Sequence, residues 1–296
     1  MWSAASGLSF CLLNALSRKL TIELDPMQAQ FLRYLFGIVV LLPLVWRQGL
    51  AAYRPLRPGG QFLRGAVHAL GLMLWYTALP QIPLADSTAI GFTGPIFIMI
   101  GAFLFLGEPM RWERWLATTI GLAGVMIVLV PKLLGGGSGG GSSTLSGGHY
   151  HLLMLASAPV FAASFLLTKA LTRYETPGVI VLWQAISVTL FSLPLALLHW
   201  QTPNASQWLG FFFCGLLGTA GHYFLTRSFR AADISATQSV KFLDLVWASL
   251  LGWMVFADLP TQSTLIGGAV ICAATLWVAR RESRQHGRTL PIESTH

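Results

Sequence analysis

Apolar runs of about 20 residues recur along nearly the whole chain. At a rise of 1.5 Å per residue, a helix of about 20 residues crosses the roughly 30 Å hydrocarbon core of a bilayer. Lipid offers the backbone no hydrogen-bond partners, so a spanning segment must be a helix or part of a closed barrel. The runs lack the alternation of apolar and polar residues that is typical of barrel strands. The sequence therefore predicts an all-α integral membrane protein.

The composition supports this interpretation and excludes several other classes. Only 10% of the residues are charged and 54% are hydrophobic, whereas a soluble domain is about a quarter charged. The formal charge of +8 does not indicate nucleic acid, because the basic residues form short clusters between the apolar runs instead of one stripe. Cys11, Cys214 and Cys272 lie inside runs, without the spacing of a metal site. We expect no metal, no cofactor and no nucleic-acid partner.

The apolar runs divide into ten predicted spans that form two similar halves. Their ranges are 3–22, 28–46, 62–80, 84–106 and 114–133, followed by 150–172, 178–199, 207–228, 233–256 and 262–280. A shift of about 150 residues places Lys19 on Lys169 and Asp86 on Asp233, which indicates duplication. Because five spans are an odd number, the second copy must enter the membrane from the opposite side. The predicted architecture is ten transmembrane helices in two inverted five-helix repeats.

The Lys and Arg residues predict the orientation of the chain. Fourteen lie in connections or at the span ends on one side, three lie likewise on the other side, and Arg33 and Lys241 fall deeper inside spans. By the positive-inside rule the rich side is cytoplasmic, and both termini lie there. The predicted organisation is a first repeat over 1–134, a Gly/Ser-rich linker over 135–148, a second repeat over 149–281 and a cytoplasmic tail over 282–296. The linker has the composition of flexible segments, native or engineered.

Paired motifs close the fourth and ninth predicted spans. They are Gly107-Glu108-Pro109, followed by Gly121-Leu122-Ala123-Gly124, and Ala257-Asp258-Leu259-Pro260, followed by Gly267-Gly268. With these motifs the chain resembles, over practically its whole length, the EamA-like branch of the drug/metabolite transporter superfamily. Within that branch it is similar to the YddG-type bacterial exporters of aromatic and other amino acids.

The resemblance implies a multi-pass protein of the bacterial inner membrane. It also implies alternating access to a central cavity lined mainly by spans 1, 3, 4, 6, 8 and 9. The four-span relatives use a glutamate in their first span for proton coupling. Neither span 1 nor span 6 here contains an acid, so proton antiport by that route is not expected.

Polar and ionisable side chains inside spans are the candidate substrate-binding residues, because each is costly near the bilayer centre. Lys241 and Asp244 lie three residues apart near the middle of the ninth span, on one helical face. They would bind the charged groups of a zwitterion or neutralise each other and fix packing. The remaining candidates are His222, Tyr223, His68, Trp75, Tyr76, Asn14 and Ser164. Helix packing is the alternative role for each. Asp86 is expected to cap its helix, and Arg33 to snorkel to the interface.

The function predicted from these features is secondary transport of a small metabolite, most simply export of aromatic or neutral amino acids. A Walker loop for ATP hydrolysis is absent from the sequence. Alternatives are transport of drugs or nucleotide-like metabolites on the same fold, an intramembrane lipid enzyme, and a receptor or channel. The expected partners are the lipid bilayer and a small-molecule substrate. The chain is expected to be a monomer, with a homodimer through Ala117 and Gly121 as the alternative.

Overall fold

The computed structural model describes residues 2–91, 93–107, 148–231, 242–257 and 261–286, together with residue 234 and eleven positions between 112 and 131. Every regular element in these residues is helical, which confirms the predicted class. The elements are α1 (Trp2–Glu23), α2 (Pro26–Gln48), η1 (Leu50–Tyr53), α3 (Pro58–Ala78), η2 (Leu79–Gln81), α4 (Leu84–Gly91), α5 (Gly94–Leu106), α7 (Gly148–Leu171), α8 (Pro177–Leu198), α9 (Ala205–Ala231), α10 (Phe242–Phe256) and α11 (Gln262–His286). Among the described residues, α2, α3 with η2, α7, α8 and α9 are long and apolar enough to cross a membrane.

Local capping residues fix where several helices begin. The Asp25 carboxylate accepts hydrogen bonds from the backbone N–H groups of Met27 and Gln28, at 2.8 and 3.2 Å, so α2 begins at Pro26. The Thr176 hydroxyl has the same role at the start of α8. Proline at the first helical position suits these sites, because the N–H that it lacks would have no partner there. These two starts lie within two residues of the predicted ones.

The predicted span over 84–106 consists of two helices and not of one continuous helix. α4 ends at Gly91, and α5 begins at Gly94 after a turn at Thr93. Pro95 has no N–H to continue a helix from the preceding turn, and the glycines favour non-helical backbone. The Thr93 carbonyl instead accepts the N–H groups of Ile96 and Phe97. Of the predicted span over 233–256, the structure describes α10 from Phe242, and residues 235–241 lie outside its description.

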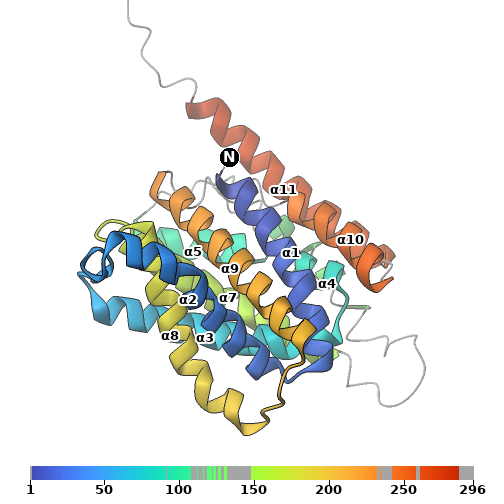
Figure 1. The fold of residues 1–296 in the computed structure, drawn as a ribbon. Coiled ribbons are helices and arrows are strands. Elements are labelled where there is room, and N and C mark those ends of the chain that lie inside the picture. The colour runs from blue at the N-terminus through green and yellow to red at the C-terminus, as the bar shows by residue number, and fades with distance from the viewer. Residues whose placement is uncertain are drawn as a thin grey trace, which may run out of the picture.

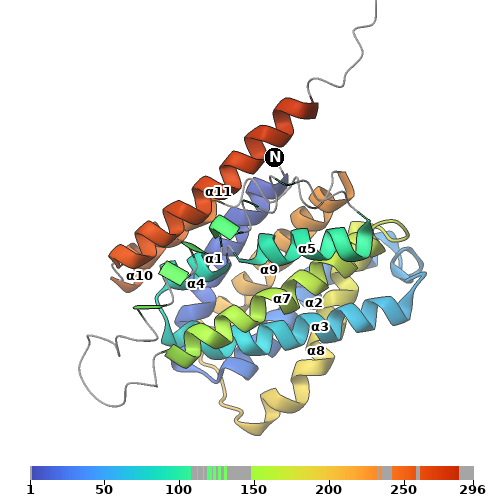
Figure 2. The ribbon, with the colours of Figure 1, turned by 180° about the vertical axis from the view of Figure 1, so that it is seen from behind.

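The helices form a ring in which the two halves of the chain alternate. Around the ring, α1 packs on α9, α9 on α2, α2 on α8, α8 on α3, and α3 on α7. The ring closes through α4, which packs on both α7 and α10, and through α10, which packs on α1. Figure 1 shows α1, α9 and α2 nearest the viewer, and Figure 2 shows α5, α7 and α3 on the opposite face. Both the start of α1 and the end of α11 lie at the same end of the bundle (Figure 1).

Glycines allow α9 to approach α2 closely. A Cβ atom at Gly215 would lie 2.6 Å from the backbone carbonyl carbon of Phe36 and 2.8 Å from the backbone nitrogen of Gly37. Such distances are far below van der Waals contact, so only glycine fits at this position. One turn further along α9, Gly218 faces the guanidinium of Arg33. The close contact thus positions a charged side chain of α2 inside the ring.

Candidate functional site

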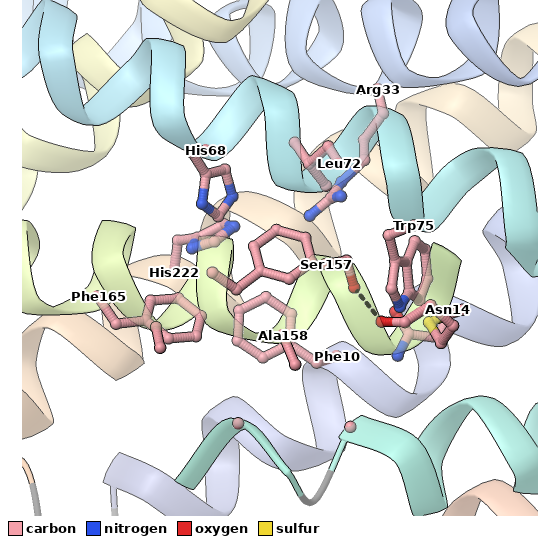
Figure 3. Close-up of a pocket in the computed structure, with 15 residues that line it drawn as sticks. Phe10, Asn14, Arg33, His68, Leu72, Trp75, Ser157, Ala158, Phe165 and His222 are labelled. Atoms are coloured by element: carbon pink, nitrogen blue, oxygen red, sulfur yellow. Dashed lines mark hydrogen bonds between the residues drawn. The ribbon is translucent and has the colours of Figure 1, made fainter. Parts of the chain in front are cut away.

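A cavity of about 170 Å³ lies inside the ring of helices. It is lined by α1, α2, α3, α7 and α9 and by the break between α4 and α5. The lining residues are Phe10, Asn14, Arg33, His68, Leu72, Trp75, Gly91, Gly94, Met154, Ser157, Ala158, Phe161, Ala162, Phe165 and His222. Figure 3 shows these side chains converging on one space from helices that are far apart in the sequence.

Aromatic rings form much of the cavity wall. Phe161 and Phe165, one turn apart on α7, are nearly parallel, with an interplanar angle of 17° and centroids 6.3 Å apart. Phe10 packs edge-on against His222 with a centroid distance of 4.9 Å. Trp75, near the end of α3, adds a third kind of ring to the cavity wall. Flat apolar faces of this kind favour a flat aromatic solute, because offset-stacked and edge-to-face ring contacts add to the energy of burial.

Two histidines at one end of the cavity share a tyrosine hydroxyl. Nε2 of His68 lies 3.0 Å and Nε2 of His222 lies 3.3 Å from the hydroxyl oxygen of Tyr34. Nδ1 of His68 lies 3.0 Å from the hydroxyl oxygen of Ser164, which fixes the plane of that ring. The amide nitrogen of Gln184 completes the cluster, 3.4 Å from Nε2 of His222. The histidines are therefore held in place at one end of the cavity, with both ring nitrogens of His68 and Nε2 of His222 turned toward protein partners.

Behind this cluster, the buried guanidinium of Arg64 binds the two halves together. It is 1% exposed and donates to the hydroxyl of Thr168, the backbone carbonyl of Ile180 and the amide oxygen of Gln184. These partners lie on α7 and α8, whereas Arg64 lies on α3. Hydrogen bonds to charged donors are about twice as strong as neutral ones, so Arg64 acts as a rigid structural centre.

Arg33 is also buried, but it faces the cavity. It is 5% exposed and lines the cavity from α2. Its guanidinium carbon lies 4.7 Å from the ring centroid of Tyr34, and Nη1 donates to the hydroxyl oxygen of Tyr76 at 3.5 Å. Ser17 lies 3.1 Å from that same tyrosine oxygen. The cavity thus combines aromatic walls with a positive charge and several neutral polar groups.

Comparison with known proteins identifies the family. The model of the EamA-like transporter family matches residues 1–130 and again residues 149–280. The chain belongs to the EamA-like transporter family. It is 35% identical over 288 residues to a riboflavin transporter of Rhizobium johnstonii, covering 96% of this chain and 92% of the relative. It is 28% identical over 287 residues to an S-adenosylmethionine uptake transporter of Rickettsia felis, covering 97% and 94%.

A solved crystal structure shares the fold of this transporter. The two chains are 18% identical, with a TM-score of 0.69 over 95% of this chain and 98% of the other. Identity at this level supports the fold and no more. Family membership establishes that the protein is a membrane-embedded transporter of small molecules and not an enzyme.

The transporter places four of the predicted site residues on the cavity wall. Asn14, His68, Trp75 and His222 line it directly. Ser164 lies one layer behind, as the partner of the His68 ring.

Three of the other predicted residues, Tyr76, Tyr223 and Asp244, are described by the structure and are absent from the cavity lining. Tyr76 is 1% exposed and reaches the cavity only through its hydrogen bond with Arg33. Tyr223 packs against the separate cluster that contains Tyr53 and Val179. Asp244 packs against α1, where the hypothetical Cβ of Gly7 would lie within 2.3 Å of Oδ1. Lys241 lies outside the described residues.

Sequence reasoning missed three contributors to the transporter's site. Arg33 was expected to snorkel to the interface, and that prediction was wrong because its side chain turns into the ring of helices. Arg64 lies near the start of the predicted span over 62–80 and was not among the candidates, whereas α3 begins at Pro58 and places it inside. The aromatic pair Phe161 and Phe165 could have been found from its i, i+4 spacing on one face of a helix.

Asp86 of the transporter has partners on two other helices. It lies in the first turn of α4 and is 1% exposed. Its carboxylate accepts the hydroxyl hydrogen of Thr264 on α11, and Oδ2 lies 3.4 Å from Nε2 of His151 on α7. This cluster ties three helices together away from the cavity-lining residues. In the described part of the chain, no group of three His, Cys, Asp or Glu residues could hold a metal ion.

Proposed function

We propose that this transporter carries a small, flat heteroaromatic metabolite of the riboflavin class across the bacterial inner membrane. The observation that supports this best is the cavity, which combines a wall of phenylalanine and tryptophan rings with a polar edge from His68, His222, Asn14 and Arg33. A fused heteroaromatic ring needs both: apolar faces on which to stack and hydrogen-bonding groups for its nitrogen and carbonyl atoms.

The riboflavin transporter relative supports this substrate class. Its 35% identity extends over 96% of this chain, so the similarity includes every helix that lines the cavity. S-adenosylmethionine, named for the second relative, carries a sulfonium cation. The buried guanidinium of Arg33 has no carboxylate partner in the described residues and would repel a cation in the cavity. A neutral flavin suits the cavity better.

Export of amino acids is the competing function. The carboxylate of an amino acid could pair with Arg33. However, the cavity-lining residues that the structure describes include no Asp or Glu for the ammonium group. Burying an ammonium without a partner costs several kcal/mol. A cavity that offers a partner to the carboxylate but none to the ammonium disfavours a zwitterionic solute. Lys241 and Asp244 are the residues that an amino-acid substrate would require.

We propose that transport proceeds by alternating access of two inverted repeats, residues 1–134 and 149–281, joined by the 135–148 linker. The alternation of the two halves around the ring supports inverted symmetry, since α1 packs on α9 as α7 packs on α3. Both described ends lie at one end of the bundle, as an even number of spans requires. The excess of Lys and Arg assigns that end and the 282–296 tail to the cytoplasm. One chain supplies the whole cavity lining, so a monomer suffices.

Uptake into proteoliposomes tests the substrate class. Purified protein is reconstituted, and accumulation of radiolabelled riboflavin, tryptophan and S-adenosylmethionine is compared with that in empty liposomes. We expect accumulation of riboflavin that unlabelled riboflavin competes away. Phe161→Ala should lower it about tenfold, since base-like rings stacked on an aromatic side chain gain about 1–3 kcal/mol. The matched control is Phe105→Ala, whose ring is 79% exposed on the outer surface. Flux of tryptophan without flux of riboflavin would overturn the proposal in favour of amino-acid transport.

A further inference from the structure

We propose that Arg33 is the residue that selects the solute by charge and by edge chemistry. Its guanidinium binds an edge with adjacent hydrogen-bond acceptors, such as the carbonyl oxygen and ring nitrogen of a pyrimidinedione, and it excludes cations. This inference rests on the proposed function, because it names the part of a flavin-like ring that the cavity recognises.

The unused donors of Arg33 are the main evidence. A guanidinium has five N–H donors. Arg33 is 5% exposed, yet one long hydrogen bond to Tyr76 and the face of the Tyr34 ring are its partners in the described residues. A buried charge with so few partners is costly, so such groups normally pair with an opposite charge or a set of acceptors. Arg33 lines two spaces, the cavity of about 170 Å³ and a pocket of about 10 Å³ between α2, α8 and α9. Only the cavity has room for a solute, so we assign the missing partner of the guanidinium to a solute in the cavity.

Arg64 provides the internal comparison. It is even less exposed than Arg33, at 1%, and it too has no carboxylate partner in the described part of the chain. Three acceptors nevertheless surround it, on Thr168, Ile180 and Gln184. Arg64 is absent from the cavity lining, whereas Arg33 belongs to it. The protein therefore gives each of the three guanidinium nitrogens of Arg64 an acceptor and leaves donors of Arg33 open to a solute.

The surroundings hold Arg33 in the orientation that this role needs. Gly218 leaves room behind it, since a Cβ there would lie 3.1 Å from Nε and 3.3 Å from Nη2. Figure 3 shows the side chain extending past Leu72 into the space between His68 and Trp75. A solute stacked on the aromatic wall would meet the guanidinium with its edge. The planar fork of arginine suits two adjacent acceptors, whereas lysine offers only a point charge.

Equilibrium binding to the purified protein tests the inference. Binding is measured by equilibrium dialysis, read from the absorbance of each ligand, with three tricyclic probes: riboflavin, the neutral phenazine without a pyrimidinedione, and the cationic proflavine. We expect Arg33→Gln to raise the Kd of riboflavin at least tenfold and to change the Kd of phenazine by no more than twofold. The same variant should lower the Kd of proflavine. Arg33→Lys keeps the positive charge, so it should bind proflavine as weakly as the wild type does. It lacks the planar fork, so its riboflavin binding should stay as weak as that of Arg33→Gln. Arg47→Gln is the matched control, since Arg47 is an exposed arginine on the same helix.

The outcomes separate this inference from the proposed function. Equal weakening of riboflavin and phenazine by Arg33→Gln, in protein that elutes and melts like the wild type, would overturn the edge-recognition role. If wild-type protein binds no riboflavin, the proposed substrate class fails. The comparison then uses phenazine-1-carboxylate against proflavine. A preference for the anion that Arg33→Gln removes would still support charge selection by Arg33, and the lack of such a preference would overturn it.

Discussion

Replacing Gly215 by alanine tests whether the close approach of α9 to α2 holds the ring together. The new Cβ would lie 2.6 Å from the backbone carbon and 2.7 Å from the Cβ of Phe36, and 2.8 Å from the backbone nitrogen of Gly37. Carbon atoms in favourable contact lie about 3.5–4.0 Å apart. The two helices would therefore have to separate by about 1 Å. Rotating a side chain cannot relieve the clash, because the opposing atoms belong largely to the backbone.

The expected cost follows from two opposing terms. Overpacking of this kind destabilises by about 1–3 kcal/mol, and a backbone clash belongs at the upper end of that range. Alanine gains about 1 kcal/mol over glycine inside a helix, which offsets part of the loss. We expect Gly215→Ala to lower the free energy of unfolding by about 2 kcal/mol. With an unfolding entropy of about 2.1 cal/mol/K per residue, such a loss lowers the Tm of this 296-residue chain by about 3 °C.

Thermal unfolding in detergent, followed by the loss of the monodisperse peak in size-exclusion chromatography, measures the effect. Gly210→Ala on the same helix is the control. Its Cβ would meet only the side chain of Leu20, at 3.2 Å or more, and a leucine side chain can move. We expect Gly210→Ala to melt at or slightly above the wild-type temperature. Equal Tm values for the two variants would refute the argument that the α2–α9 contact depends on glycine.

Three further substitutions test the site and its support. Gly218→Ala adds a Cβ 3.1 Å from Nε of Arg33, so we expect riboflavin binding several-fold weaker with little change in Tm; unchanged affinity would contradict this role. Tyr34→Phe removes the hydroxyl that lies 3.0 Å from His68, and we expect the free energy of unfolding to fall by about 1–3 kcal/mol. An unchanged Tm would contradict a stabilising role for the hydrogen bonds between Tyr34 and the two histidines. Asp86→Asn replaces a carboxylate that is 1% exposed, and we expect a Tm several degrees lower, with a wild-type Tm as the contrary result.

Local chemistry explains why much of the helical framework could be predicted. Runs of apolar residues must be helices in lipid, whatever the rest of the chain does. The starts of α2 and α8 follow from Asp25 and Thr176 with the prolines after them, which lie within a few residues of the helices that they cap. Pro95 marks an interruption of the span over 84–106, but a spanning helix can tolerate a proline, so the sequence alone does not predict two separate helices there.

The candidate site could be predicted only in part. Asn14, His68, Trp75 and His222 were found because polar and aromatic groups inside spans need an explanation. The direction of the Arg33 side chain could not be predicted. A long side chain about two turns from the start of its helix can turn outward to the interface or inward to a cavity, and the choice depends on helices that are distant in sequence.

The amino-acid sequence alone determined the helical class, the duplication and the transporter family, because all three depend on patterns repeated along the chain. The tertiary structure decided the chemistry of the cavity. Tyr34 and His222 are 188 residues apart, yet they meet in one cluster, since helices from the two halves alternate around the ring. Which side chains face inward depends on the rotation of each helix against its neighbours, and those contacts form only when the whole ring is assembled.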